Sequence, residues 1–135
     1  MMNYSIILKE HDLKVTPQRL AIADIINVNG HVTIDFLYAL MAKKFDSISL
    51  ATIYKNINLM LKNSFIQEVS LPQVKNVYEL TKASHSHLVC SKCLRVEDID
   101  IDLDSSFKTV TQTTEFSIDS ASLVFNGLCI DCKDN

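Results

Sequence analysis

The 135-residue sequence has little glycine, little proline and no long apolar run. Two residues each of Gly and Pro exclude a collagen-like or low-complexity chain, and 47 % apolar residues are typical of a globular protein. No run approaches the roughly 18 apolar residues of a membrane helix, and Lys9, Glu10 and Asp12 interrupt the N-terminal segment. The length suffices for one compact domain or two very small ones. We therefore expect a cytoplasmic protein with no membrane partner.

Positive charge is also scarce. Thirteen Lys and Arg against 16 Asp and Glu give a net charge of -3, which argues against binding nucleic acid or acidic lipid by bulk charge alone. The charge is uneven, because residues 1–80 carry eight basic and seven acidic residues, whereas residues 81–135 carry five and nine. All four cysteines lie in the second part. We predict two modules, residues 1–81 and 84–135.

The first module has the pattern of a winged helix-turn-helix. Thr16 and Pro17 are typical of an N-cap and a first helical residue, and Asn29-Gly30 is typical of a helix end. Apolar residues recur at helical spacing after these signals. The predicted elements are helices over residues 3–10, from Pro17 to Asn29, from Thr33 onward and over 50–63, then strands over 65–71 and 74–80 joined through Pro72-Gln73.

The helix predicted over residues 50–63 has two distinct faces. Its apolar face carries Leu50, Ile53, Ile57 and Leu61. A second face, about 120° away, carries Ala51, Tyr54, Lys55 and Asn58. An aromatic ring, a cation and an amide can enter a major groove and contact base edges or phosphates. An ordinary amphipathic helix with a solvated face explains the same pattern, so the helix alone leaves both interpretations open.

The second module is predicted to be α+β, and it contains four cysteines in two Cys-x-x-Cys pairs. We expect strands over residues 84–90, 94–101 and 123–128 and a helix over 104–114. With no signal peptide evident, the spacing indicates metal rather than disulfides. Four thiolates favour a closed structural zinc site, which stabilises a small module but offers no position for substrate. The predicted zinc ligands are Cys90, Cys93, Cys129 and Cys132.

A second group of metal-binding residue types stands beside the cysteines. His85 and His87 share one face of the predicted strand, because side chains alternate along a strand. Candidate partners are His31, Glu79 and Asp98. Mixed nitrogen and oxygen ligands suit iron, manganese or zinc. Two surface histidines in a polar segment are the alternative, and His11, isolated among charged residues, is expected to be solvated.

The sequence contains the motifs VTPQR at residues 15–19, SLATIYKNI at 49–57 and HSHLVCSKC at 85–93, followed by the last cysteine pair. Together they resemble the ferric uptake regulator family, and its peroxide-sensing branch in particular. The resemblance covers nearly the whole chain in the same order. It implies an N-terminal winged helix-turn-helix domain followed by a small α/β dimerisation domain with a four-cysteine zinc site.

The resemblance also implies a homodimeric bacterial repressor of double-stranded operator DNA. The positions that match DNA-contacting residues of the family are Lys14, Arg19, Thr52, Tyr54 and Lys55. The positions that match its regulatory metal ligands are His31, Glu79, His85, His87 and Asp98. The implied cofactors are structural Zn(II) and regulatory Fe(II) or Mn(II). Metal would favour the DNA-binding conformation through differential affinity.

The sequence departs from the family pattern at two places. A further site of some iron-sensing members looks lost, because Ser84, Ser86 and Ala121 stand at its positions. Asp98 matches peroxide-sensing members, which carry Asp there, whereas Glu79 matches iron-sensing members. The five-residue set is therefore a hybrid.

The sequence predicts a peroxide-sensing repressor of oxidative-stress and metal-homeostasis genes, on the strength of Asp98. In peroxide-sensing relatives, a ligand histidine is oxidised when bound Fe(II) reacts with peroxide, and His31 and His85 match those positions. An iron-responsive regulator is the alternative, and a zinc-ribbon interaction module is a weaker one that leaves residues 15–60 unexplained. We expect no enzyme, because the zinc-deaminase signature and a His-Glu-x-x-His helix are both missing.

Overall fold

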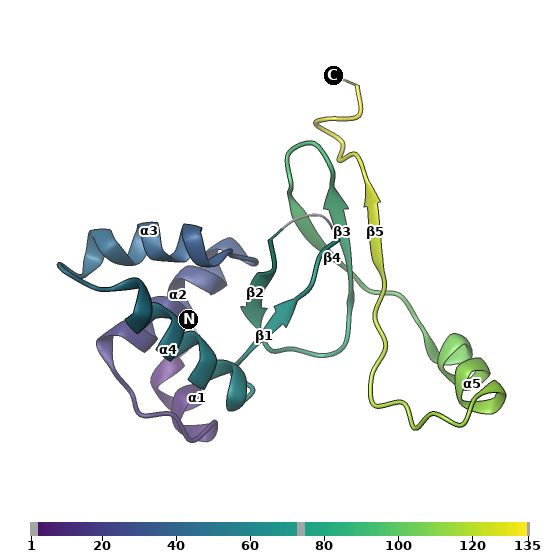
Figure 1. Ribbon diagram of the computed structural model, residues 1–135, viewed down its shortest axis with the longest axis horizontal. Helices are drawn as coiled ribbons and strands as arrows, with labels where there is room; N and C mark the ends of the chain where they lie inside the picture. Colours follow the sequence, from purple (N-terminus) through teal and green to yellow (C-terminus); the bar gives the residue numbers. More distant parts are fainter. Residues whose placement is uncertain (1–2, 73–74, 135) are drawn as a thin grey trace. The chain divides into compact units, whose positions relative to one another are not determined.

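The computed structural model describes residues 3–72 and 75–134. The chain divides into two compact units, Met1–Thr81 (unit 1) and Lys82–Asn135 (unit 2). Unit 1 contains helices α1 to α4 and strands β1 and β2, and unit 2 contains strands β3 to β5 and helix α5 (Figure 1).

Unit 1 is a helical domain that ends in a two-stranded wing. Side-chain oxygens cap its longer helices, because the hydroxyls of Thr16, Thr33 and Ser49 accept the N–H groups of Arg19, Phe36 and Thr52. Gly30 ends α2 with a φ of 77°, a conformation that favours glycine. The elements are α1 (Tyr4–Glu10), α2 (Pro17–Asn29), α3 (Ile34–Lys44), α4 (Leu50–Lys62), β1 (Ile66–Val69) and β2 (Val77–Leu80).

The core of unit 1 lies among its helices and the wing. The fully buried side chains of α2, α3 and α4 include Ile22, Ile26, Leu37, Met41, Ile53, Ile57 and Met60. Not every residue of the predicted apolar face of α4 is buried, because Leu50 is 40 % exposed. Leu50 lies in the first turn, and Met60 near the other end of α4 supplies a core side chain that the predicted face omitted.

The wing strands are antiparallel and shorter than predicted. Gln67 pairs with Glu79, and Val69 pairs with Val77. An isolated bridge between Val32 and Tyr78 ties the segment between α2 and α3 to β2. Gln73 in the predicted connection lies outside the described residues. The combination of helices and wing is the winged helix-turn-helix that the sequence predicts.

Unit 2 is built on a three-stranded sheet with the order β4-β3-β5. The central strand β3 (Ser86–Cys90) pairs antiparallel with β4 (Val96–Ile99) and parallel with β5 (Val124–Gly127). Helix α5 (Asp104–Thr113) connects β4 to the segment before β5. These elements form the small α/β module predicted from the sequence, again with shorter strands.

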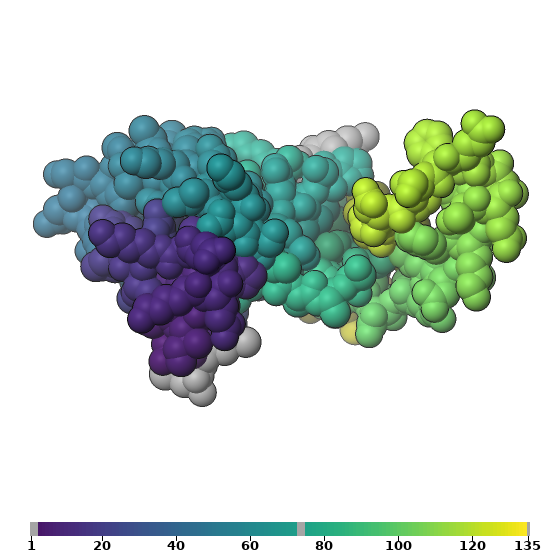
Figure 2. Space-filling model, turned by 90° about the horizontal axis from the view of Figure 1, so that it is seen from below, coloured from purple at the N-terminus to yellow at the C-terminus, as the bar shows by residue number. Residues whose placement is uncertain are grey.

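Unit 2 buries few apolar side chains. Between Lys82 and Asp134, only Val89 and Cys90 are buried apolar residues, and α5 has no buried residue. Phe107, Val110 and Leu123 line an apolar pocket between α5 and the chain that follows it. Figure 2 shows this part of the chain in yellow-green. Large exposed apolar residues of unit 2 are Leu94, Val110, Phe116, Leu123, Phe125, Leu128 and Ile130. So much exposed apolar surface marks an interaction site.

None of the helices formed by residues 3–72 and 75–134 combines the length and the apolarity that a membrane span requires.

Replacing Ile57 with Ala should lower the free energy of unfolding of unit 1 by about 2 to 5 kcal/mol. Ile57 is 1 % exposed, so the substitution leaves a cavity between α4 and the rest of the core. Asn58→Ala on the exposed side of the same helix should change this free energy by less than about 0.5 kcal/mol. Urea denaturation followed by circular dichroism measures both values, and equal losses would contradict the assigned core.

Candidate metal centres and candidate DNA-contacting residues

The four cysteines of unit 2 lie together. The Sγ atoms of Cys90, Cys93, Cys129 and Cys132 lie within 4.8 Å of one another, and those of Cys93 and Cys129 are 3.8 Å apart. Sulfur atoms bound tetrahedrally about 2.3 Å from one zinc ion are about 3.8 Å apart. The cluster therefore fits a closed four-thiolate zinc site.

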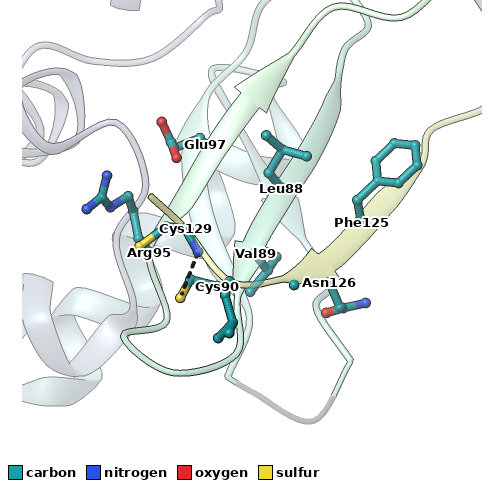
Figure 3. Close-up of a pocket in the computed structure, with 10 residues that line it drawn as sticks. Leu88, Val89, Cys90, Arg95, Glu97, Phe125, Asn126 and Cys129 are labelled. Atoms are coloured by element: carbon teal, nitrogen blue, oxygen red, sulfur yellow. Dashed lines mark hydrogen bonds between the residues drawn. The ribbon is translucent and has the colours of Figure 1, made fainter. Parts of the chain in front are cut away.

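Strand pairing explains how two distant cysteine pairs meet. Cys90 ends β3 and pairs with Gly127 of the parallel strand β5, so the chain after β5 returns beside the first pair. An ion pair between Arg95 and Asp131 also joins the two segments, and its hydrogen bond raises the pKa of the guanidinium. Cys90 and Cys129 lie beside a cavity of about 150 Å³ whose lining includes Leu88 and Phe125 (Figure 3).

The cysteines differ in acidity. The N–H groups of Cys93 and Cys129 donate to Sγ of Cys90, with N···S distances of 3.5 and 3.4 Å. These two bonds lower the pKa of Cys90 to about 5, so it is a thiolate at neutral pH. The pKa of Cys132 is raised to about 12, first by hydrogen bonding to Cys129 and then by burial. Because the thiolate is the metal-binding form, a cation must displace the Cys132 proton.

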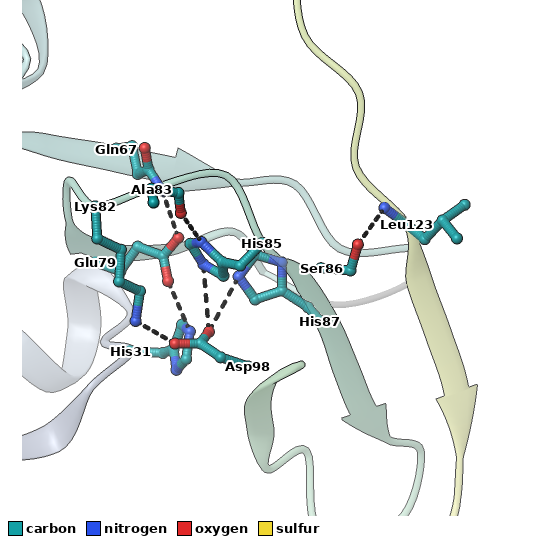
Figure 4. Close-up of polar contacts among 10 residues, drawn as sticks. All are labelled: His31, Gln67, Glu79, Lys82, Ala83, His85, Ser86, His87, Asp98 and Leu123. Carbon is teal, nitrogen blue, oxygen red and sulfur yellow. Dashed lines mark hydrogen bonds and ion pairs between the residues drawn. The ribbon is translucent and has the colours of Figure 1, made fainter. Parts of the chain in front are cut away.

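In unit 1, the side chains of His31 and Glu79 are in contact and largely buried. Glu79 is 1 % exposed, and its Oε2 lies 2.8 Å from Nε2 of His31. Its Oε1 accepts a 2.7 Å hydrogen bond from Nε2 of Gln67, the residue opposite Glu79 in the wing (Figure 4). The bridge between Val32 and Tyr78 holds His31 next to β2. A buried carboxylate requires polar partners, and Gln67 and His31 each lie against one of the two oxygens of Glu79.

In unit 2, the side chain of Asp98 contacts two histidines. His87 on β3 pairs directly with Asp98 on β4. Oδ1 of Asp98 lies 3.3 Å from Nε2 of His85 and 3.4 Å from Nε2 of His87, while Oδ2 accepts a hydrogen bond from Lys82 (Figure 4). The side chains of His85 and His87 are only 9 % and 6 % exposed, so they are not solvated surface histidines.

The hydrogen bonding of His85 fits a metal ligand. Its Nδ1 lies 2.9 Å from the carbonyl oxygen of Ala83, which can only accept, so Nδ1 donates there and Nε2 is the nitrogen left to bind a metal. Two atoms bound about 2.1 Å from one ion are about 3.0 to 3.4 Å apart, for angles between 90° and tetrahedral. The nitrogen–oxygen distances of 2.8, 3.3 and 3.4 Å within the two groups are close to this range. Within each unit, the structure thus brings the predicted ligands together, and their role as ligands stays a prediction.

Two residues of these groups were missed by reasoning from sequence. Gln67 would follow from the wing register, but the sequence does not determine that register. Lys82 lies in the predicted boundary between the two modules, and no sequence pattern indicated that it contacts Asp98. His11 is also not simply solvated, because its Nδ1 lies 2.9 Å from the carbonyl oxygen of Asn63 and its ring packs edge-on against Phe65.

The positions at which a further family site looks lost lie around one cavity. Ser84, Ser86 and Ala121 line it together with Asp102 and other residues of unit 2. None of the three substituted side chains supplies an imidazole or a carboxylate, as the sequence predicts.

The predicted DNA-contacting residues of α4 are accessible. Tyr54 is 45 % exposed and Lys55 is also exposed. Thr52 is half-buried, and its hydroxyl lies 2.9 Å from the capping hydroxyl of Ser49, so it belongs to the helix cap. Lys14 is exposed and Arg19 is half-buried at the start of α2.

Residues 10–126 match the ferric uptake regulator family. The chain therefore belongs to that family of metal-responsive transcription regulators, and it is not an enzyme. Regulators of the family bind operator DNA and are dimers. The resemblance inferred from the three motifs is confirmed.

The most similar curated relatives include peroxide regulators. The chain is 28 % identical over 129 residues to the peroxide-responsive repressor PerR of Staphylococcus epidermidis, covering 94 % of this chain and 86 % of that protein. It is 28 % identical over 128 residues to the peroxide operon regulator of Bacillus subtilis, covering 93 % and 88 %.

Solved structures of the family share the fold. The Campylobacter jejuni peroxide stress regulator gives a TM-score of 0.71 at 31 % identity, covering 97 % of this chain and all of that chain. The Vibrio cholerae ferric uptake regulator gives 0.76 at 27 % identity, covering 94 % and 100 %. A zinc uptake regulator complexed with zinc and DNA gives 0.77 at 19 % identity, covering 97 % and 91 %, which shows the fold alone.

The zinc affinity of the metal-free protein should rise with pH from about pH 6 to about pH 9, because bound cysteines must lose their protons. Cys90, with its lowered pKa, is already ionised over this range, whereas Cys132 still holds its proton. Competition with a chromophoric chelator at several pH values measures the slope. Cys132→Ser should weaken binding and flatten the slope, and Ser120→Ala outside the cluster should do neither. An affinity independent of pH would contradict the assignment.

Proposed function

We propose that the chain is a metal-dependent, DNA-binding transcriptional repressor of the cytoplasm that senses peroxide. Residues 1–81 serve as its DNA-binding domain, and residues 84–135 serve as its dimerisation and metal-binding domain. The observation that carries the proposal is the pair of donor groups in a chain of this family: His31 with Glu79 in unit 1, and His85 and His87 with Asp98 in unit 2. The controlled genes are those of oxidative stress and metal homeostasis.

The residues of both groups would together hold one regulatory ion. Neither group alone supplies the five donors, because unit 1 offers one nitrogen and one carboxylate and unit 2 offers two nitrogens and one carboxylate. Glu79 and His85 are six residues apart in the chain, so their Cα atoms are at most about 20 Å apart. This mixed donor set suits Fe(II) or Mn(II).

Such an ion controls DNA binding by differential affinity. The conformation in which both donor groups reach the ion binds it more tightly than any other, so metal raises the population of that conformation. If that conformation also presents α4 and the wing of each protomer correctly to an operator, metal and DNA binding are coupled. The structural zinc acts separately, because four thiolates leave no position that could exchange with the sensing site.

Dimerisation through unit 2 agrees with its exposed apolar residues. Phe116 and Ile130, 73 % and 74 % exposed in the single chain, are examples of side chains that a second copy would cover. A dimer presents two copies of α4, so each protomer reads one half of an operator. The net charge of +1 over residues 1–80 indicates that a few placed contacts, rather than bulk attraction, provide the affinity.

Peroxide sensing is the finer part of the proposal. Asp98 matches the peroxide-sensing branch, and the relatives described above include several peroxide regulators. Fe(II) held by these residues would provide the electrons that reduce hydrogen peroxide, and that reduction would produce an oxidant beside the ligands. His31 and His85 are the histidines proposed to be oxidised, and an oxidised imidazole no longer binds the ion well. An iron-responsive regulator is the second candidate, and Glu79 favours it.

Metal-dependent DNA binding tests the first part of the proposal. The Mn(II)-loaded protein is used to select duplexes from a random pool, and affinity is then measured anaerobically with Mn(II), Fe(II) or chelator. Asp98→Asn should weaken metal-activated binding at least about tenfold, because it removes a charged ligand. Asp100→Asn makes the same change two residues away at an exposed position and should have less than a twofold effect. Failure of Mn(II) and Fe(II) to activate binding would refute the function.

Histidine oxidation tests the second part. After dilute hydrogen peroxide, mass spectrometry of the Fe(II) protein should find one added oxygen atom on His31 or His85, together with loss of DNA binding. The peptide that contains His11 is an internal control and should stay unmodified, as should all histidines of the Mn(II) protein. Intact histidines with DNA binding retained would leave the iron-responsive regulator as the function.

A further inference from the structure

Arg19 is held by two neutral acceptors. Its Nε donates to Oδ1 of Asn56 at 3.1 Å, and its Nη1 donates to the carbonyl oxygen of Lys14 at 2.8 Å. Its own backbone N–H donates to the hydroxyl of Thr16, the N-cap of α2, at 3.2 Å. The start of α2, the preceding segment and α4 are therefore joined through one guanidinium.

The side chain of Asn56 has a fixed orientation. Its Nδ2 donates to the carbonyl oxygen of Thr52 at 3.0 Å, one turn earlier in α4. With Nδ2 committed to a carbonyl, Oδ1 must face Arg19, because a flipped amide would set an oxygen against the carbonyl and a nitrogen against the guanidinium. Asn56 is half-buried, whereas its neighbours Tyr54 and Lys55 are exposed. It therefore lies beside the proposed DNA-contacting surface without belonging to its most exposed face.

The charge of Arg19 is not neutralised within unit 1. Some cations of the described chain do have carboxylate partners, namely Lys75 with Asp35, Lys82 with Asp98 and Arg95 with Asp131. Among the described residues, Arg19 has no carboxylate within ion-pair distance. Its two protein bonds use two of its five N–H groups. The remaining three are sufficient for a bidentate contact to a phosphate.

We propose that Asn56 is a positioning residue, which orients Arg19 for a DNA phosphate while leaving its positive charge uncompensated. The inference rests on the proposed function, because it concerns the same DNA-binding surface. An amide suits this position because it fixes the orientation of the guanidinium plane without neutralising its positive charge. A carboxylate at the same place would form an internal ion pair that a phosphate must displace.

Asn56→Asp, Arg19→Gln and the double variant test the inference in a double-mutant cycle. Operator affinity is measured with Mn(II) at several salt concentrations. Asn56→Asp should weaken binding about tenfold and reduce the slope of log K against log salt by about one, because one phosphate contact is lost. In the Arg19→Gln background, the same substitution should change affinity by less than about twofold, since no guanidinium remains to be oriented.

A matched control separates this effect from net charge. Asn27→Asp introduces the same charge at an exposed position of α2 and should leave the slope unchanged. Melting temperatures identify a variant that is merely unfolded. If Asn56→Asp does not fold, Asn56→Ala replaces it in the cycle, with a smaller loss of affinity that again disappears without Arg19.

Additive losses in the double variant would overturn the inference, because Asn56 would then act on DNA independently of Arg19. Unchanged affinity and slope in Asn56→Asp would overturn it as well. Both results leave the proposed function standing, because the unsubstituted protein still binds operator with metal. Absence of metal-dependent binding by the unsubstituted protein refutes the function itself, and is a distinguishable result.

Discussion

Unit 2 depends on the contact between its two cysteine pairs. Its described part buries few apolar side chains, so packing alone contributes little to its stability. The parallel pairing of β3 with β5 brings Cys129 to Cys90, and zinc of the kind that the cluster fits would stabilise that arrangement. The same strand β3 carries His87, opposite Asp98. The cysteine cluster and the second donor group thus share strand β3. Zinc binding that stabilises the position of β3 therefore also stabilises the position of His87.

Unit 1 uses side-chain amides to orient charged groups. Gln67 donates to the carboxylate of Glu79, and Asn56 accepts from the guanidinium of Arg19. In both cases the amide fixes the direction of a charged group without changing the local net charge. Packing determines the fold of the unit, whereas these hydrogen bonds to neutral amides determine the direction in which the two charged groups point.

Most of the fold could be predicted from the sequence because its signals are local. Caps such as Thr16 and Ser49 and the apolar periodicity of α4 identify helices without knowledge of the tertiary structure. Strand pairing is not local. A connection through Pro72-Gln73 alone would have placed Gln67 opposite Tyr78, whereas the observed register places it opposite Glu79. The sequence did not predict the hydrogen bond of Gln67 to Glu79 for that reason. The contact of Lys82 with Asp98 was not predicted because no sequence pattern connects that lysine with a carboxylate on a later strand.

The alternation of β2 restricts how the wing can change in length. Val77 and Glu79 face the interior, whereas Tyr78 and Leu80 between and after them are only partly covered. The chain that connects Val69 to Val77 can gain or lose residues and still join the same paired positions. A single insertion between Val77 and Glu79 would instead turn the carboxylate outward and bury its neighbour. A change of length is therefore tolerated in the connection of the wing and excluded from β2.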